Sequence, residues 1–118
     1  MNRFLPALVT VALFAPVAAV AAGDAARGKK LWDQKCGTCH ERSAMGPPYK
    51  KIFGQGAGRV PGFVYTEALE GSNVTWTEET LDKWIENPDK FIPGNRMGFK
   101  TRNAVDRADI IAYLKIRE

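Results

Sequence analysis

The pentapeptide Cys36-Gly37-Thr38-Cys39-His40 contains both cysteines and the only histidine of this 118-residue chain. Cysteines three positions apart on a helix project to the same side, and the residue that follows them points partly the same way. A fold that places this segment on a helix therefore presents two thiols and one imidazole to a single ligand.

Four kinds of chemistry use cysteines at this spacing. A structural zinc site needs four ligands, more than the two cysteines and one histidine of this chain. A disulfide between Cys36 and Cys39 would close a very short loop and stabilise little, and a thiol–disulfide redox pair is typical of folds with strands, which this sequence does not indicate. Cys-x-x-Cys-His is, in contrast, the sign of c-type haem attachment. We predict that Cys36 and Cys39 bind one haem c covalently and that His40 binds its iron.

The second axial ligand of the iron is predicted from the methionines. Met45 follows His40 closely and starts on the same side of the haem, whereas Met97 lies in the Pro- and Gly-containing loop Pro93-Gly94-Asn95-Arg96-Met97 far along the chain. We predict Met97 as the sixth ligand; a position that is open, or bound by water or lysine, is the alternative. Histidine–methionine ligation raises the reduction potential and saturates the iron.

The first 22 residues have the three parts of a secretory signal peptide. Arg3 supplies a positive start, residues 4–20 are apolar, and small residues at 19–22 suit cleavage. A retained membrane anchor is the alternative, but the apolar run is short and contains two prolines. We predict a cleaved signal peptide at 1–22, a single domain at 23–118, a periplasmic location and no stable membrane insertion after cleavage.

Charge is distributed unevenly along the predicted domain. Residues 27–59 carry eight basic and two acidic residues, residues 60–89 one and seven, and residues 90–118 seven and three. This asymmetry favours steering toward a partner with an acidic surface. Nucleic-acid binding is disfavoured, because no basic stretch is interleaved with aromatic residues and the chain is predicted to be exported.

The pattern of the predicted domain indicates an all-α fold with long loops. We expect helices after Asp24, Thr77 and Asn103, each of which is a favourable N-cap, and one or two helical turns within 66–72. Pro88 is expected to stop the second long helix. Residues 41–62 hold five glycines and three prolines, and 91–102 form a second Pro/Gly loop. Many large apolar residues lie in or next to these loops: Phe53, Val60, Phe63, Tyr65, Phe91, Ile92, Met97 and Phe99. We therefore expect that an apolar group in the middle of the fold organises the loops.

Longer segments resemble the class I cytochromes c, the mitochondrial-type and bacterial small soluble group. The similarity covers nearly all of 23–118 and includes "GKKLWDQKCGTCH", "GPPYKKIFG", "PGFVYTEAL", "TWTEETLDKWIENPDKFIPGNRMGF" and "RADIIAYLK". This resemblance implies three main helices, plus short helices and long loops, around one covalently attached haem. It also implies that the N-terminal helix crosses the C-terminal helix, with Gly28 and Trp32 against Ile110 and Tyr113.

The resemblance implies further haem contacts. Pro47 matches the residue whose carbonyl receives the other N–H of the histidine ligand. Tyr65 and Trp76 match the groups that hydrogen-bond the inner haem propionate, and Phe99 matches an aromatic residue beside the methionine side of the haem. Four cations fall where the family has a positive rim around the exposed haem edge: Lys30, Lys35, Lys90 and Arg96.

Four positions depart from the family pattern. Gln55 stands where an arginine usually lies near the propionates, so that charge is missing or comes from Arg59. Trp84 replaces a tyrosine that hydrogen-bonds near the methionine sulfur, Leu69 replaces an asparagine, and Asn95 replaces a threonine. These changes bear on the reduction potential and on the strength of the methionine bond.

The function that these observations favour is that of a monomeric single-electron carrier that catalyses no reaction on a small substrate. Its partners would be redox proteins with acidic docking surfaces, such as a cytochrome bc complex, an oxidase, a reductase, a dehydrogenase or a photosynthetic reaction centre. Two alternatives remain. One is a ligand-binding or peroxidase-like haem protein with a labile sixth ligand, and the other is a cytochrome subunit dedicated to one dehydrogenase complex.

Overall fold

The computed structural model describes residues 9–15 and 23–117. The rest of the predicted signal peptide, 1–8 and 16–22, lies outside the described residues. Residues 9–15 form neither helix nor strand, and the apolar side chains of Val9, Val11, Leu13 and Phe14 are exposed. Within the described part of the chain, no helix combines the length and the apolar character needed to cross a bilayer.

The described residues form six helices, of which three are long, as predicted. Their order is α1 (Ala25–Lys35), α2 (Gly37–His40), α3 (Glu67–Glu70), α4 (Glu78–Glu86), α5 (Pro88–Phe91) and α6 (Ala104–Ile116). The only extended pairing among these residues is an isolated bridge between Gly56 and Thr75. The prediction of an all-α fold with long loops is therefore confirmed.

The predicted N-caps begin the three long helices. The Asp24 carboxylate accepts from the N–H of Arg27, the Asn103 amide oxygen accepts from two N–H groups of α6, and Thr77 forms a reciprocal capping box with Thr80. Each cap satisfies donors that have no partner inside the helix. Thr66 caps α3 in the same way and fixes the short turn expected there.

One helix differs from the expectation. Pro88 was predicted only to stop a helix, and α4 does end just before it, at Glu86. Yet Pro88 is also the first residue of α5, for which Asn87 provides the cap. Proline lacks the N–H that the first helical turn cannot use, and its fixed φ suits that position. The predicted Pro/Gly loop therefore begins after Phe91 instead of at it.

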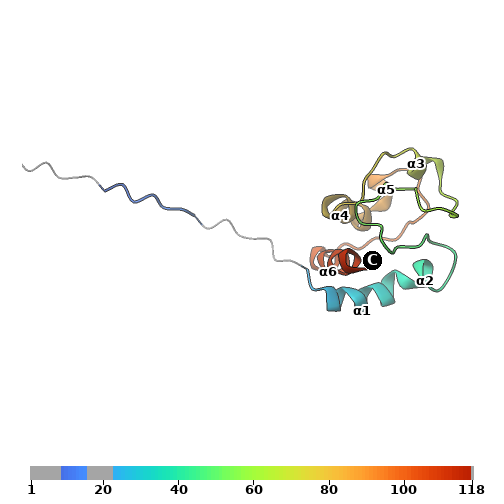
Figure 1. The fold of residues 1–118 in the computed structure, drawn as a ribbon, viewed down its shortest axis with the longest axis horizontal. Coiled ribbons are helices and arrows are strands. Elements are labelled where there is room, and N and C mark those ends of the chain that lie inside the picture. The colour runs from blue at the N-terminus through green and yellow to red at the C-terminus, as the bar shows by residue number, and fades with distance from the viewer. Residues whose placement is uncertain (1–8, 16–22, 118) are drawn as a thin grey trace, which may run out of the picture.

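The crossing of α1 and α6 forms the base of the fold (Figure 1). A Cβ built on Gly28 would lie 1.8 Å from the carbonyl oxygen of Asp109, so the two backbones approach more closely than any side chain at 28 would permit. Arg27 bridges the helices to Asp106 and Asp109, and its hydrogen bond to Asp109 lowers the pKa of that carboxyl. The expected crossing at Gly28 is thereby confirmed.

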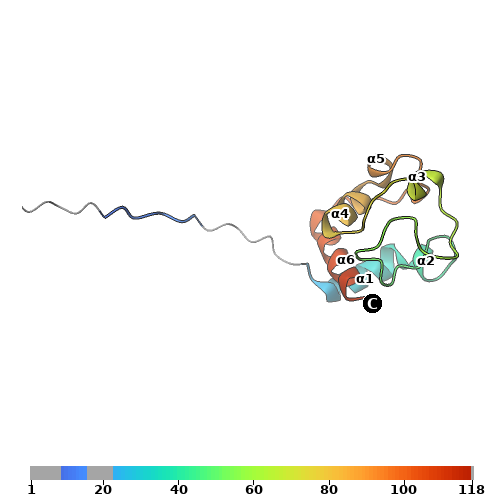
Figure 2. The same cartoon turned by 45° about the horizontal axis from the view of Figure 1, so that its top comes forward.

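The core lies along α6 and the helices that pack on it. Ile110 is fully buried, and the Trp32 ring lies 6.2 Å from that of Tyr113, as the resemblance implied. Figure 2 shows α3, α4 and α5 on the side away from α1 and α2, with the long 41–66 segment passing between the two groups. Residues of α2 and of the loops that face it line a large interior space.

Candidate functional site

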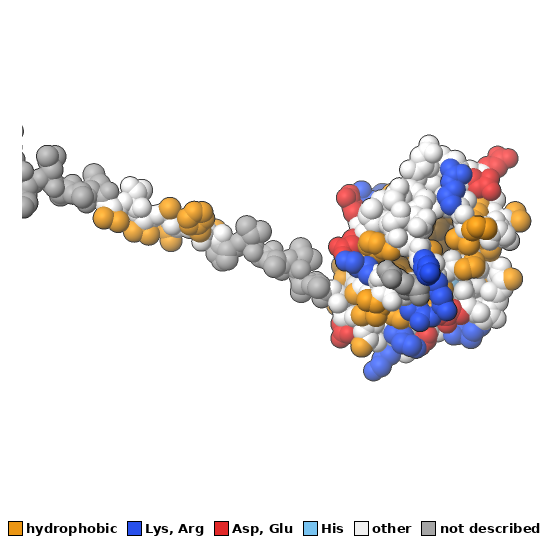
Figure 3. All heavy atoms as spheres, in the orientation of Figure 1, with side chains coloured by type: hydrophobic (Ala, Val, Ile, Leu, Met, Phe, Trp, Pro, Cys, Tyr) orange, Lys and Arg blue, Asp and Glu red, His pale blue; other side chains and the backbone are white. Residues whose placement is uncertain are grey.

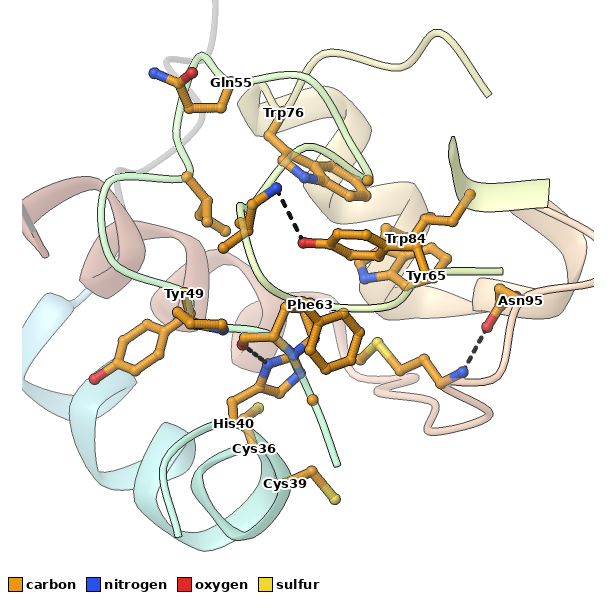
Figure 4. A pocket seen from close by; sticks show the side chains of 18 of the residues that line it. Cys36, Cys39, His40, Tyr49, Gln55, Phe63, Tyr65, Trp76, Trp84 and Asn95 are labelled. Atoms are coloured by element: carbon orange, nitrogen blue, oxygen red, sulfur yellow. Dashed lines mark hydrogen bonds between the residues drawn. The ribbon is translucent and has the colours of Figure 1, made fainter. Parts of the chain in front are cut away.

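A cavity of about 980 Å³ occupies this space, a large volume for a domain of this size. Its walls come from α2, from the 41–66 segment, from α4 and from the loop before α6 (Figure 4). Five of the large apolar loop residues line it: Val60, Phe63, Tyr65, Met97 and Phe99. The other three, Phe53, Phe91 and Ile92, pack on the helical core instead.

The Cys-x-x-Cys-His segment forms one wall of the cavity. Cys36 ends α1, the single turn of α2 follows, and Cys36, Cys39 and His40 all line the cavity. The two thiols are free and do not form a disulfide. Burial raises the pKa of the Cys36 thiol to about 11, the opposite of the lowered pKa that activates a redox cysteine.

The imidazole of His40 is held in one orientation. Its Nδ1 lies 2.8 Å from the carbonyl oxygen of Pro47, so Nδ1 carries the hydrogen and donates it. In the neutral ring this leaves the lone pair on Nε2 free for a metal. Gly46 packs under the ring, because a Cβ there would lie 2.9 Å from two of its atoms.

Met97 reaches the same cavity from the loop between α5 and α6. Its N–H donates to Oδ1 of Asn95 at 2.8 Å, and the Asn95 amide donates in turn to the Ile92 carbonyl oxygen, also at 2.8 Å. Figure 4 places Asn95 away from the wall that carries His40 and Cys39. Asn95, one of the departures from the family pattern, therefore fixes the turn that presents Met97.

Aromatic residues line the part of the cavity between these walls. Tyr65, Trp76, Trp84 and Phe99 all contribute to the lining. The Tyr65 hydroxyl accepts from the N–H of Val60 at 3.3 Å, and burial raises the pKa of this tyrosine. Trp76 is buried, with its ring 5.6 Å from that of Trp84, whereas Phe99 is 42% exposed and lies at the rim.

The charged residues that line the cavity, among those that the structure describes, are all positive. Its described lining contains no aspartate or glutamate, and five cations contribute to it: Lys35, Lys50, Lys51, Arg59 and Arg96. Gln55 and Leu69 also line the cavity, whereas Lys30 and Lys90 are exposed outside it. The cavity therefore combines an apolar interior with a positive surrounding, which suits a flat apolar group that carries negative substituents.

Comparison with known proteins decides the family. The family model described as cytochrome c matches residues 25–117. The chain belongs to the cytochrome c family. The curated relatives include cytochrome c of Euglena viridis, 42% identical over 98 aligned positions, and the match covers 79% of this chain and 96% of the relative. Cytochrome c2 of Rhodomicrobium vannielii is 41% identical over 120 aligned positions, and the match covers 97% of this chain and 95% of the relative.

A solved structure gives the same result for the fold. Cytochrome cH from Methylobacterium extorquens superposes with a TM-score of 0.74 at 37% identity, covering 79% of this chain and 98% of the other. The predicted class I monohaem cytochrome c fold is thus confirmed. As a cytochrome c, the chain binds one c-type haem covalently through two cysteines and acts in electron transfer, not as an enzyme.

The cavity fits such a haem. The only two cysteines of the chain and its only histidine lie together on one wall, and the remaining lining is mostly apolar. Two buried polar atoms on residues of this lining, Nε1 of Trp32 and Oγ1 of Thr101, have no hydrogen-bond partner among the described residues. When bound, the haem supplies the one-electron chemistry, and the protein supplies its position and electrostatics.

Sequence reasoning missed three residues at this site. Gly46 supports the His40 ring, Thr101 lines the cavity, and Tyr49 stacks on Trp32 with ring centroids 4.2 Å apart while its hydroxyl donates to Glu41. The pKa of Tyr49 is raised, mainly by burial of its hydroxyl and then by the hydrogen bond to Glu41. Of these three, only Gly46 had a signal in the sequence. A glycine directly before the Pro47-Pro48 pair suggests a place where the backbone approaches another group closely, here the His40 ring.

Proposed function

We propose that the chain is a soluble periplasmic single-electron carrier whose haem iron is bound by His40 and Met97. The observation that carries this proposal is that these two residues line one cavity from different segments, α2 and the loop before α6. The Nδ1 hydrogen bond to Pro47 leaves His40 Nε2 free for the iron, and Asn95 holds the Met97 backbone. An iron with both axial positions filled has no site for substrate, which suits electron transfer.

The cavity lining supports the other predicted haem contacts. Among the described residues, Tyr65 accepts a hydrogen bond but makes none through its own O–H, so this hydroxyl remains available to a propionate. Trp76 lies on the same lining, and Arg59 supplies a positive charge close to Gln55 in the sequence. We propose that Tyr65 and Trp76 bind the inner propionate and that Arg59 compensates for the arginine that Gln55 replaces.

The surface around the cavity supports docking of an acidic redox partner. Three exposed apolar residues, Met45, Val64 and Phe99, lie on the lining together with the cations Lys35 and Arg96. Figure 3 shows Lys and Arg side chains beside apolar ones on the face that it presents. Charge steers the encounter, and the apolar residues give a short-lived contact. We propose this rim as the docking surface, extended by Lys30 and Lys90 on neighbouring helices.

Carbon monoxide tests whether the axial positions are filled. We expect that carbon monoxide does not change the absorption spectrum of the reduced wild-type protein at neutral pH, because Met97 occupies the sixth position. A spectrum that shifts promptly on addition of the gas would mean an open or labile site, and would favour the ligand-binding alternative over the carrier.

The periplasmic location rests on the predicted signal peptide. The alignment with cytochrome c2 spans 97% of this chain and therefore extends into the apolar N-terminal segment. We expect the protein in the periplasmic fraction to begin at Gly23, with an intact mass equal to residues 23–118 plus one haem. Recovery of the full-length chain with the membrane fraction would contradict cleavage and would indicate a retained anchor.

A further inference from the structure

The segment 41–49 follows His40 directly, and one side-chain hydrogen bond closes it into a loop. Glu41 is the first residue after the histidine, and Tyr49 lies eight residues further on. The hydroxyl of Tyr49 donates to the carboxylate of Glu41, so the two ends of the segment are joined. We call this closed segment the proximal loop.

The proximal loop supplies the hydrogen-bond partner of His40. The carbonyl oxygen of Pro47 lies 2.8 Å from Nδ1 of the ring (Figure 4). The N–H of Gly46 donates to the Cys39 carbonyl oxygen at 2.8 Å, which ties the middle of the loop to α2. Pro47 is only two residues from Tyr49, so the position of its carbonyl depends on how firmly Tyr49 is held.

The ring of Tyr49 is fixed by packing. Tyr49 is only 4% exposed, and its ring stacks on that of Trp32 with centroids 4.2 Å apart. The Trp32 ring in turn lies 5.5 Å from the ring of His40. Two contacts therefore hold Tyr49, the aromatic stack and the hydrogen bond to Glu41. Replacement by phenylalanine keeps the first and removes only the second.

Glu41 provides a fixed acceptor at the other end of the loop. Its side chain is exposed, but its N–H donates to the Gly37 carbonyl oxygen at 2.9 Å, which holds its backbone at the end of α2. A carboxylate accepts a stronger hydrogen bond than a neutral group does. Glu41 can therefore restrain Tyr49 without being buried itself.

The restraint on Pro47 bears on the electronic properties of His40. A hydrogen bond from the outer nitrogen of a ligating histidine raises the basicity of the nitrogen that binds the metal. A more basic imidazole stabilises ferric iron over ferrous iron, and hydrogen bonds of this kind are one means by which proteins set the potential of a haem. A well-placed Pro47 carbonyl therefore lowers the reduction potential, and a displaced one raises it.

We propose that Tyr49 is a positioning residue for His40. Its hydrogen bond to Glu41 keeps the Pro47 carbonyl against Nδ1, and thereby lowers the reduction potential of the haem. This inference rests on the proposed ligation of the iron by His40. It adds to that ligation a restraint that acts from outside the ligand set.

Tyr49→Phe in the haem-loaded protein tests the restraint without any change of charge. We expect the one-electron equilibrium to shift about threefold toward the reduced form, a rise in potential of about 28 mV. In the reduced protein, NMR should show the Nδ1 proton of His40 exchanging with solvent about fivefold faster, because its acceptor is less firmly held. Tyr113→Phe is the matched control. Tyr113 belongs to the same aromatic cluster, 6.2 Å from Trp32 between ring centroids, but lies on α6 outside the proximal loop. Its replacement should shift the potential less than a third as much.

Two variants of Glu41 separate the hydrogen bond from the charge. Glu41→Gln and Glu41→Ala both remove one negative charge, which by itself raises the potential. Only Glu41→Ala also removes the acceptor, so it should raise the potential further than Glu41→Gln does. When Tyr49→Phe is already present, the two variants should give equal potentials, because the hydrogen bond is absent from both.

Three results would overturn the proposal. If Tyr49→Phe leaves the potential and the Nδ1 exchange unchanged, Tyr49 does not position His40. If Tyr113→Phe has an equal effect, the cause is a general loosening of the aromatic cluster. If the two Glu41 variants have equal potentials with Tyr49 intact, the hydrogen bond is not responsible.

Failure of the ligation itself has a separate signature. The carbon-bound ring protons of His40 in the reduced wild-type protein should show the large upfield shift of a ligand held over a haem. Their absence would overturn the proposed ligation, and with it the role of Tyr49. Circular dichroism shows whether each variant is folded. The comparison of the Glu41 variants changes an exposed side chain and decides the question even if Tyr49→Phe does not fold.

Discussion

Replacing both Cys36 and Cys39 by serine should leave a chain without covalently bound haem and without a stable fold. Without haem, the apolar lining of a cavity of about 980 Å³ would face water. Burial of such lining is the main stabilising contribution to a domain that is stable by only roughly 5–15 kcal/mol. We expect acid–acetone extraction to remove any haem from the double variant, and its helical circular dichroism to fall to that of an unfolded chain once haem is removed.

Thr38→Ala provides the matched control for this variant. Thr38 lies between the two cysteines, is exposed, and receives a hydrogen bond from Arg42. Its replacement changes the same short segment without touching either thiol, and should leave one extraction-resistant haem per chain. If the serine variant also kept its haem through extraction, the attachment chemistry assigned to these cysteines would be wrong.

Replacing Met97 by alanine should open the sixth coordination position and lower the reduction potential. A thioether sulfur is a soft ligand that favours ferrous over ferric iron, and water, which would take its place, does not. We expect the potential to fall by more than about 60 mV, a tenfold change in the one-electron equilibrium. The reduced variant should then bind carbon monoxide at neutral pH.

Met45→Ala is the control that separates ligation from general effects of losing a methionine. Met45 also lines the cavity, 3.6 Å from the sulfur of Cys39, but its side chain is 75% exposed. Its removal should shift the potential much less than removal of Met97 and should not admit carbon monoxide. Equal effects from the two variants would contradict the assignment of Met97 as the iron ligand.

Local signals predicted most of the fold. Asp24, Thr77 and Asn103 each begin a long helix because their side chains bond N–H groups a few residues ahead. The start of α5 at Pro88 was missed, since the same proline that ends one helix can begin the next, and sequence pattern alone does not distinguish the two uses.

The part of the site that could be predicted is the part formed by residues close together in the sequence. Cys36, Cys39 and His40 follow from one short motif. Which loop residues face the cavity did not follow, because Phe53 and Phe63 are equally apolar and only tertiary packing sends the first to the core and the second to the lining. The role of Asn95 was likewise hidden, since its hydrogen bonds to Met97 and Ile92 depend on the shape of the turn.

The far-red absorption of the oxidised protein tests the central proposal most directly. A methionine sulfur bound to ferric haem iron gives a weak charge-transfer band in this region. We predict that wild type and Met45→Ala show this band and that Met97→Ala lacks it, which would establish Met97 as the ligand of an axially saturated electron carrier. Absence of the band from the wild-type protein at neutral pH would contradict the proposal.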